Sequence, residues 1–114
     1  RDLPKTDEAA RAAADDLVRR YPGDARGYFY RALSAATRGD AASAERDIRK
    51  AIELAEAYPD VFVERFRLRL HAVHALALND LKRPAEARQA AGAVCTLPAG
   101  DELLVILRKE RICR

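Results

Sequence analysis

The 114-residue chain contains no methionine and no tryptophan, and only four tyrosines and three phenylalanines. Much of its 49% hydrophobic content is alanine, so the surfaces available for packing are built mainly from small side chains. Small side chains favour close contact between helices over a thick core between two sheets. Glycine and proline number five each and fall mostly at expected breaks between helices. Because methionine is missing even at position 1, we expect a processed or excised piece of a longer protein.

Long apolar runs are also missing. No stretch approaches the roughly eighteen consecutive apolar residues that cross a bilayer, and the chain has no signal-like start. We therefore expect no membrane insertion by this segment. The net charge is +3, and both signs are interleaved along almost every segment, which is typical of a solvated surface and makes nucleic acid an unfavoured partner. Length and composition predict one folded domain with a modest core.

Motifs for catalysis, cofactors and metals are absent as well. The sequence has no glycine-rich phosphate loop and no nucleophile elbow, so we predict a protein that is not an enzyme and has no cofactor. His71 and His74 lie one helical turn apart, but no cysteine or convincing carboxylate set completes the usual three or four ligands. Arg65, Arg67 and Arg69 do not share one face of a helix, so they predict no phosphate-binding stripe.

The chain has only two cysteines, Cys95 and Cys113, which bracket a turn and the last predicted helix. A disulfide between them would fix that helix to the rest of the domain and contribute about 3 kcal/mol through loop closure. We favour this bond, which would imply an oxidising, periplasmic or otherwise extracytoplasmic compartment. The alternative is a cytosolic protein with two reduced, half-buried thiols.

What the chain does contain is a series of helical segments separated by breaks. Thr6 or Asp7 is predicted to cap the first helix and Asp24 the second. Tyr21-Pro22-Gly23 and Gly39-Asp40 form the first two breaks. Later breaks fall at Pro59 and around Pro98. The predicted helices cover residues 7–20, 25–38, 41–58, 60–80, 84–94 and 102–112.

Residues 61–70 also alternate in the manner of a β-strand. The same region carries a continuous helical stripe, and no second strand-like run exists with which a strand could pair. An isolated strand would leave its backbone groups without partners. We therefore predict one long helix, whose stripe consists of Phe62, Phe66, Leu70, Val73, Ala77 and Leu81.

Small residues recur 34 positions apart at Ala10 and Ala44, a period typical of stacked helix pairs. The order of residue types around Ala44 resembles the tetratricopeptide repeat family, through Tyr28, Ala32, Gly39-Asp40, Ala44, Ile48 and Ala51. The resemblance implies an all-α stack of antiparallel helix pairs, with about six helices and a C-terminal capping helix. Within a single domain over residues 1–114, it assigns a half repeat to 5–22, the best-matching repeat to 24–57, an extended degenerate repeat to 60–95 and the capping helix to 101–112.

The chain departs from the family pattern at several points. Ala44 and Ala87 are 43 positions apart, nine more than one repeat, so we expect longer helices around residues 55–65. Arg31 stands where the family usually has leucine, and His71 stands where it usually has an aromatic residue. The second full repeat is therefore expected to tilt away from regular stacking.

The resemblance implies a scaffold that binds a peptide or a partner protein in a groove lined by the first helix of each pair. An alternative is that the apolar members of this set only contact neighbouring helices inside a closed bundle. A second alternative is a structural or homo-oligomerisation domain, or an accessory domain of a larger bacterial protein that is membrane-bound or regulatory. The groove residues implied by spacing are Arg26, Phe29, Leu33, Thr37, Arg69, Ala72, Leu76 and Asn79.

Overall fold

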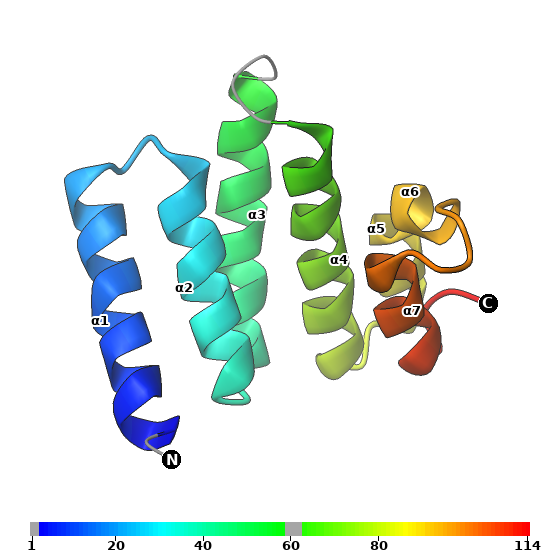
Figure 1. The fold of residues 1–114 in the computed structure, drawn as a ribbon, viewed down its shortest axis with the longest axis horizontal. Helices are drawn as coiled ribbons and strands as arrows, with labels where there is room; N and C mark the ends of the chain where they lie inside the picture. The colour runs from blue at the N-terminus through cyan, green and yellow to red at the C-terminus, as the bar shows by residue number, and fades with distance from the viewer. Residues whose placement is uncertain (1–2, 59–62) are drawn as a thin grey trace.

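The computed structural model describes residues 3–58 and 63–114, and all regular secondary structure in these ranges is helical (Figure 1). Pro59 to Phe62, including the first member of the predicted stripe, lie outside the described residues. The helices are α1 (Leu3–Arg20), α2 (Ala25–Thr37), α3 (Ala41–Ala57), α4 (Glu64–Asp80), α5 (Pro84–Ala90), α6 (Gly92–Cys95) and α7 (Glu102–Lys109).

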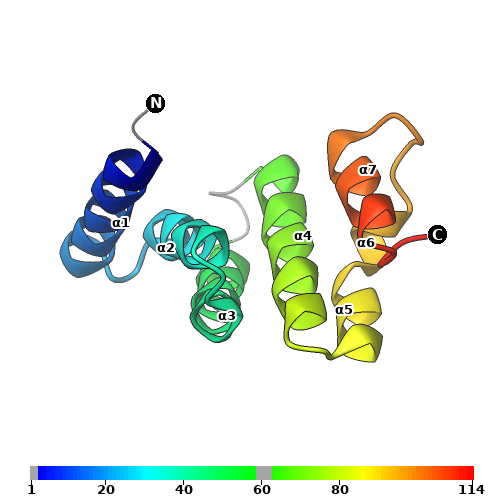
Figure 2. The same cartoon turned by 90° about the horizontal axis from the view of Figure 1, so that it is seen from below.

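Helices α1 to α4 stand side by side with alternating direction, and α5 to α7 complete one end of the stack (Figure 1). Each of the first five helices packs against the next one in the chain, and α4 also contacts α2, α6 and α7. The predicted all-α stack with a capping helix is therefore confirmed. Figure 2 shows α3 and α5 on either side of α4 along one edge of the molecule.

Two large apolar clusters and a small one of three alanines, Ala35, Ala44 and Ala77, hold the stack together. The first joins α2, α3 and the first half of α4 around Ile48 and Leu70, and it contains the alanines Ala32 and Ala51. The second joins α4 to α7 around Val94, Leu104 and Leu107. Alanines at the contact surfaces allow the helix axes to approach closely, as composition predicts.

The two alanines of the 34-residue repeat have different environments. Ala44 is completely buried between α3 and its neighbours, whereas Ala10 on α1 is exposed. The reason is that α1, within the described residues, contacts only α2. At the α1–α2 contact the fit is tight: a Cβ atom added at Gly27 would lie 3.1 Å from the Val18 backbone nitrogen.

Helix capping follows the sequence at several positions. Asp24, as predicted, caps α2 by accepting a hydrogen bond from the Arg26 backbone N–H at 2.9 Å. Asp40 caps α3 and Asp101 caps α7 in the same way. Each carboxylate satisfies a backbone donor that has no partner inside its helix.

Besides the start of α4, which is Glu64 and not residue 60 because Val63 is extended, three predicted helix boundaries are wrong. Helix α1 begins at Leu3, so Thr6 and Asp7 lie within its first turns and do not cap it; a proline at position 4 is compatible with the first turn. The predicted helix over 84–94 is interrupted at Ala91, next to the weak helix former Gly92. The seven helices described therefore exceed the expected number by one.

The third error concerns the last helix, which ends at Lys109 and not at Ile112. Arg111 adopts a positive φ of 61°, and this turn lets the Ile112 backbone N–H bond to the Leu107 carbonyl at 2.8 Å. The reversal brings Ile112 and Cys113 into the second apolar cluster. The chain therefore gains two buried side chains by ending the helix early.

The 60–80 region forms the predicted helix, α4, and the alternative of a strand is wrong for its described residues. Helices α3 and α4 have 17 residues each, against 18 in α1 and 13 in α2, so the expected lengthening around residues 55–65 stays a prediction. Cys95 and Cys113 lie at disulfide-bonding distance, with their Cα atoms 5.4 Å apart. The predicted pairing thus connects α6 to the segment that follows α7.

Candidate functional site

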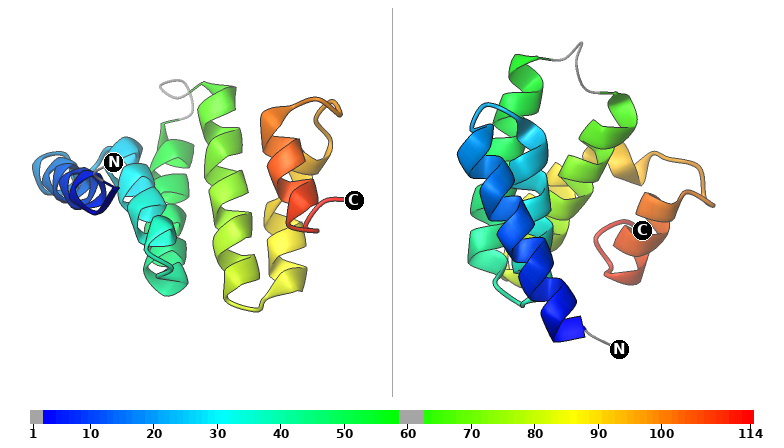
Figure 3. Two further views of the ribbon diagram at one scale, coloured as in Figure 1. Left: turned by 60° about the horizontal axis from the view of Figure 1, so that its bottom comes forward. Right: turned by 60° about the vertical axis from the view of Figure 1, so that its left-hand side comes forward.

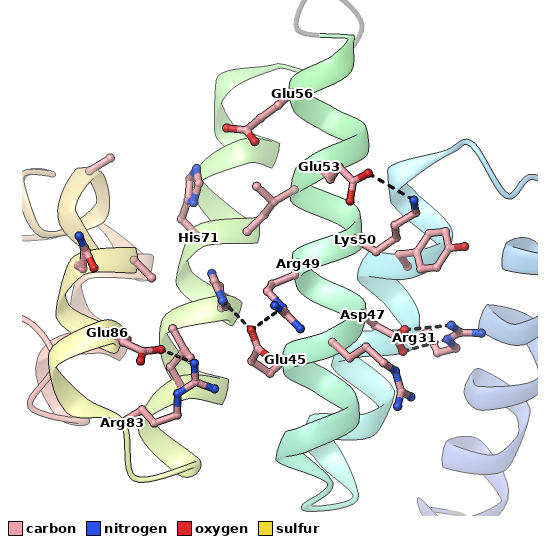
Figure 4. A pocket seen from close by; sticks show the side chains of 18 residues that line it. Arg31, Glu45, Asp47, Arg49, Lys50, Glu53, Glu56, His71, Arg83 and Glu86 are labelled. Atoms are coloured by element: carbon pink, nitrogen blue, oxygen red, sulfur yellow. Dashed lines mark hydrogen bonds and ion pairs between the residues drawn. The ribbon is translucent and has the colours of Figure 1, made fainter.

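An open hollow of about 1110 Å³ follows the outer side of α3 (Figure 4). It exists because α3 and α5 both pack on α4, while no Cα atom of α3 comes within 8 Å of α5 in the described chain. The same is true of α1 and α3, which both pack on α2. The hollow therefore runs along both sides of α3, once over α4 and once over α2.

We call the part over α4 the α4 groove. One wall is α3, the floor is α4, and the other wall is formed by α5, α6 and the turn before α5 (Figure 4). Its residues are Glu45, Arg49, Ile52, Glu56, His71, His74, Leu78, Arg83, Glu86, Gln89, Ala90 and Ala93.

The part over α2 is occupied by a charge network of the protein itself. Arg31 donates two hydrogen bonds of 2.9 Å to the carboxylate of Asp47, whose side chain is 5% exposed. The guanidinium group also lies 3.9 Å from the Asp15 carboxylate on α1 and 5.4 Å from the centre of the Tyr28 ring. The hydrogen bonds with Asp47 raise the pKa of Arg31 above its ordinary value. This network links α1, α2 and α3.

Arg31 stands where the family pattern usually has leucine. Its charge is accommodated because it pairs with the carboxylate of Asp47. A buried carboxylate is costly unless it is paired and hydrogen-bonded, and the bidentate geometry of arginine supplies both. Nothing in the sequence links these residues, which are sixteen positions apart. The pairing is a feature of the α2–α3 contact.

A second buried carboxylate lies at the base of the α4 groove. The Glu45 side chain is 9% exposed, and its Oε2 atom lies 3.0 Å from Nε2 of His74 and 3.0 Å from Nε of Arg49. Glu45 is buried because α4 packs over it. His74 occupies the position equivalent to Arg31 if the offset of 43 residues is applied. Helices α2 and α4 therefore each place a basic side chain against a buried acid of α3.

His71 lies one turn before His74 and also faces the α4 groove (Figure 4). Burial lowers the pKa of His71; the carboxylate of Glu56 opposes this effect and His74 adds to it. The neutral imidazole is consequently the favoured form at neutral pH. Among the residues that the structure describes, no three His, Cys, Asp or Glu side chains are arranged to hold a metal ion.

The walls of the α4 groove carry both charge signs. Arg83 and Glu86 form an ion pair at the rim on the α5 side. The lining also includes the half-buried apolar side chains of Ile52 and Ala90, and that of Leu78, which is 3% exposed. An apolar strip with charged edges is the usual arrangement of a surface that receives a polypeptide.

The residues predicted to bind a partner come from α2 and α4, but they are not equally accessible. Phe29 is only 6% exposed and packs edge-on against Phe66 at a ring-centroid distance of 5.2 Å. Ala72 is also buried. These two side chains form part of the core, because α4 contacts α2 at this level, and they do not line an open surface.

The other members of the predicted set remain at or near the surface. Arg26 is exposed and forms an ion pair with Asp24; Thr37 is exposed and its hydroxyl donates to the Leu33 carbonyl at 2.9 Å. Leu33 and Arg69 are exposed, whereas Leu76 and Asn79 are half-buried. Partner binding at this face stays a prediction.

Sequence analysis missed the α4 groove itself. The available signal was that Glu45 and Asp47 border the apolar stripe containing Ala44, Ile48 and Ala51, one on each side. A charged residue at the edge of a buried stripe requires a partner from a neighbouring helix. The partner of Glu45 is 29 positions away, so the pairing depends on the tertiary arrangement.

Comparisons with known proteins give no relatives: no protein-family model, no curated protein and no solved structure matches the chain. A search of the described helices finds none with the length and apolar character that crossing a membrane requires. The functional argument therefore depends on the geometry of this chain.

Proposed function

We propose that the chain is a non-enzymatic scaffold, a short tetratricopeptide-like stack that holds a segment of another protein in the α4 groove. The observation that carries the proposal is the separation of α3 and α5. Both helices pack on α4 but not on each other, so two helical walls stay open above a helical floor. Grooves between helices are a common seat for a partner helix or an extended peptide.

The size and chemistry of the hollow support a polypeptide ligand. Pockets for small molecules enclose about 300–1,000 Å³, whereas this hollow of about 1110 Å³ is open along its length. Ile52 and Ala90, which are half-buried, can contact apolar side chains of the bound segment. Charges of both signs on the rims would select the register of the bound segment.

The side chains of the hollow also favour binding over catalysis. Among its described lining residues there is no serine, threonine or cysteine to act as a nucleophile. The most buried ionisable group of the α4 groove, Glu45, is already engaged by Arg49 and His74. These groups are arranged to stabilise the contact between α3 and α4.

A peptide selection followed by mapping tests the proposal. A random peptide library displayed on phage is selected against the folded 114-residue protein, and an enriched peptide is mapped by NMR chemical-shift changes. We expect the changes to concentrate on residues of the α4 groove. Ala93→Trp, which places an indole in the groove, should weaken binding at least about tenfold, equivalent to about 1.4 kcal/mol.

Ala85→Trp is the matched control, because Ala85 is also an exposed alanine, in the neighbouring helix α5, but does not line the hollow. Equal weakening by both substitutions would contradict the proposed site. Shifts confined to Leu33, Arg69 and their neighbours would assign the partner to the face predicted from sequence. A dimer that Ala93→Trp converts to monomers would establish the oligomerisation alternative.

A further inference from the structure

The positive charge of this protein is concentrated at one end. Residues 108–114 contain four basic side chains and a single acidic one, so their net charge equals the +3 of the whole chain. In the remaining residues the numbers of basic and acidic side chains are equal, so their net charge is zero. The four basic residues of this C-terminal cluster are Arg108, Lys109, Arg111 and Arg114.

The fold gathers these cations instead of spreading them along a tail. The turn at Arg111 reverses the chain after α7, and the Arg108 Nε atom donates to the Arg114 carbonyl at 2.8 Å. The bond between Cys113 and Cys95 anchors the same segment to α6. All four basic side chains are exposed, so their charge faces the surroundings.

Two aliphatic side chains accompany the cluster. Val105 is 49% exposed and Ile106 is 40% exposed, whereas Leu104 and Leu107 on the opposite side of α7 are buried. Lys109 lies one helical turn after Val105 and Ile106 on the same side of α7, and the exposed Glu102 lies one turn before them. Helix α7 lies at the opposite end of the stack from α1, as the left view of Figure 3 shows in orange-red and blue.

We propose that α7 and the segment after it bind the surface of an anionic lipid bilayer. Clustered cations attract acidic headgroups, and neighbouring aliphatic side chains can enter the interfacial region of the bilayer. Residues 102–114 include no aromatic side chain, although base stacking on aromatic rings is a main contribution to binding of single-stranded nucleic acid. The inference uses a surface outside the α4 groove and does not rest on the proposed scaffold function.

Co-sedimentation with vesicles tests the inference. We expect the protein to bind phosphatidylcholine vesicles that contain about one third phosphatidylserine, and not vesicles of phosphatidylcholine alone. Binding should weaken between about 0.05 M and about 0.5 M salt, because the headgroup attraction is screened. Each basic residue near the surface contributes about fivefold, so Lys109→Gln combined with Arg114→Gln should lower the partition coefficient about 25-fold.

Arg19→Gln combined with Arg20→Gln is the matched control, since both arginines are exposed on α1 and the loss of charge is the same. Circular dichroism checks that each variant folds. The control pair should bind nearly as well as the unmodified protein, whereas an equal loss in both pairs would overturn a localised site.

The contribution of the aliphatic side chains is tested separately. Val105→Ser combined with Ile106→Ser should lower binding severalfold and leave the salt dependence unchanged, because no charge is removed. Tighter binding to a single-stranded RNA homopolymer than to the acidic vesicles would overturn the lipid assignment. Equal binding to both vesicle types would also overturn it.

Discussion

Replacing Arg31 by leucine, the residue usual at this position in tetratricopeptide repeats, should destabilise this protein. The substitution removes both 2.9 Å hydrogen bonds to Asp47. The Asp47 carboxylate would then stay buried without its cation, and breaking a buried pair in this way costs about 3–5 kcal/mol. Because the Arg31 side chain is 31% exposed, solvent screens part of the interaction. We therefore expect a loss of about 2 kcal/mol in the free energy of unfolding.

The double variant Arg31→Leu with Asp47→Leu distinguishes the cost of leaving the Asp47 carboxylate unpaired from the cost of changing the packing between α2 and α3. Removing both charges eliminates the unpaired carboxylate, so most of the lost stability should return. Urea unfolding followed by circular dichroism gives the free energy of unfolding and its slope for each variant. An Arg31→Leu protein as stable as the unmodified one, or a double variant less stable than the single one, would refute the role assigned to this pair.

Three further predictions concern other parts of the stack. Gly27→Ala should lower the melting temperature by several degrees, because the added Cβ would contact the backbone of α1. Gly23→Ala is the control, because a Cβ added at Gly23 would have no atom within 4 Å. Reducing the bond between Cys95 and Cys113 should cost about 3 kcal/mol in urea unfolding, and unchanged stability would refute its stapling role. Burial lowers the pKa of His71 from 6.5, so as the pH falls the imidazole is protonated in the unfolded chain before it is protonated in the folded one. The free energy of unfolding should therefore fall as the pH drops below about 6.5. His71→Gln should reduce this pH dependence in thermal melts between about pH 5 and pH 7.5.

Helix positions could be predicted because their signals are local. The stripe containing Ile48 and Ala51 has helical spacing, Asp24 precedes a helix as a capping residue, and no partner strand exists for residues 61–70. Exact boundaries depend on tertiary contacts. Helix α7 ends at Lys109 because the following turn places Ile112 and Cys113 in the core.

The candidate site depends on relations that no local pattern expresses. The spacing of the family repeat placed Phe29 on an open surface, but α4 packs against it through Phe66. The α4 groove exists because α3 and α5 do not approach each other. The pairing of Glu45 with His74 joins positions 29 residues apart. These features follow from helix placement, and a single sequence does not contain their distances.

The two ends of this stack should resist proteolysis very differently. Among the helices that the structure describes, α1 contacts α2 alone, so it can detach while the rest of the protein remains folded. At the opposite end, the disulfide between Cys95 and Cys113 links α6 covalently to the segment after α7. A protease should consequently remove residues from the amino-terminal end first, and amide hydrogen exchange should slow progressively from α1 towards α4.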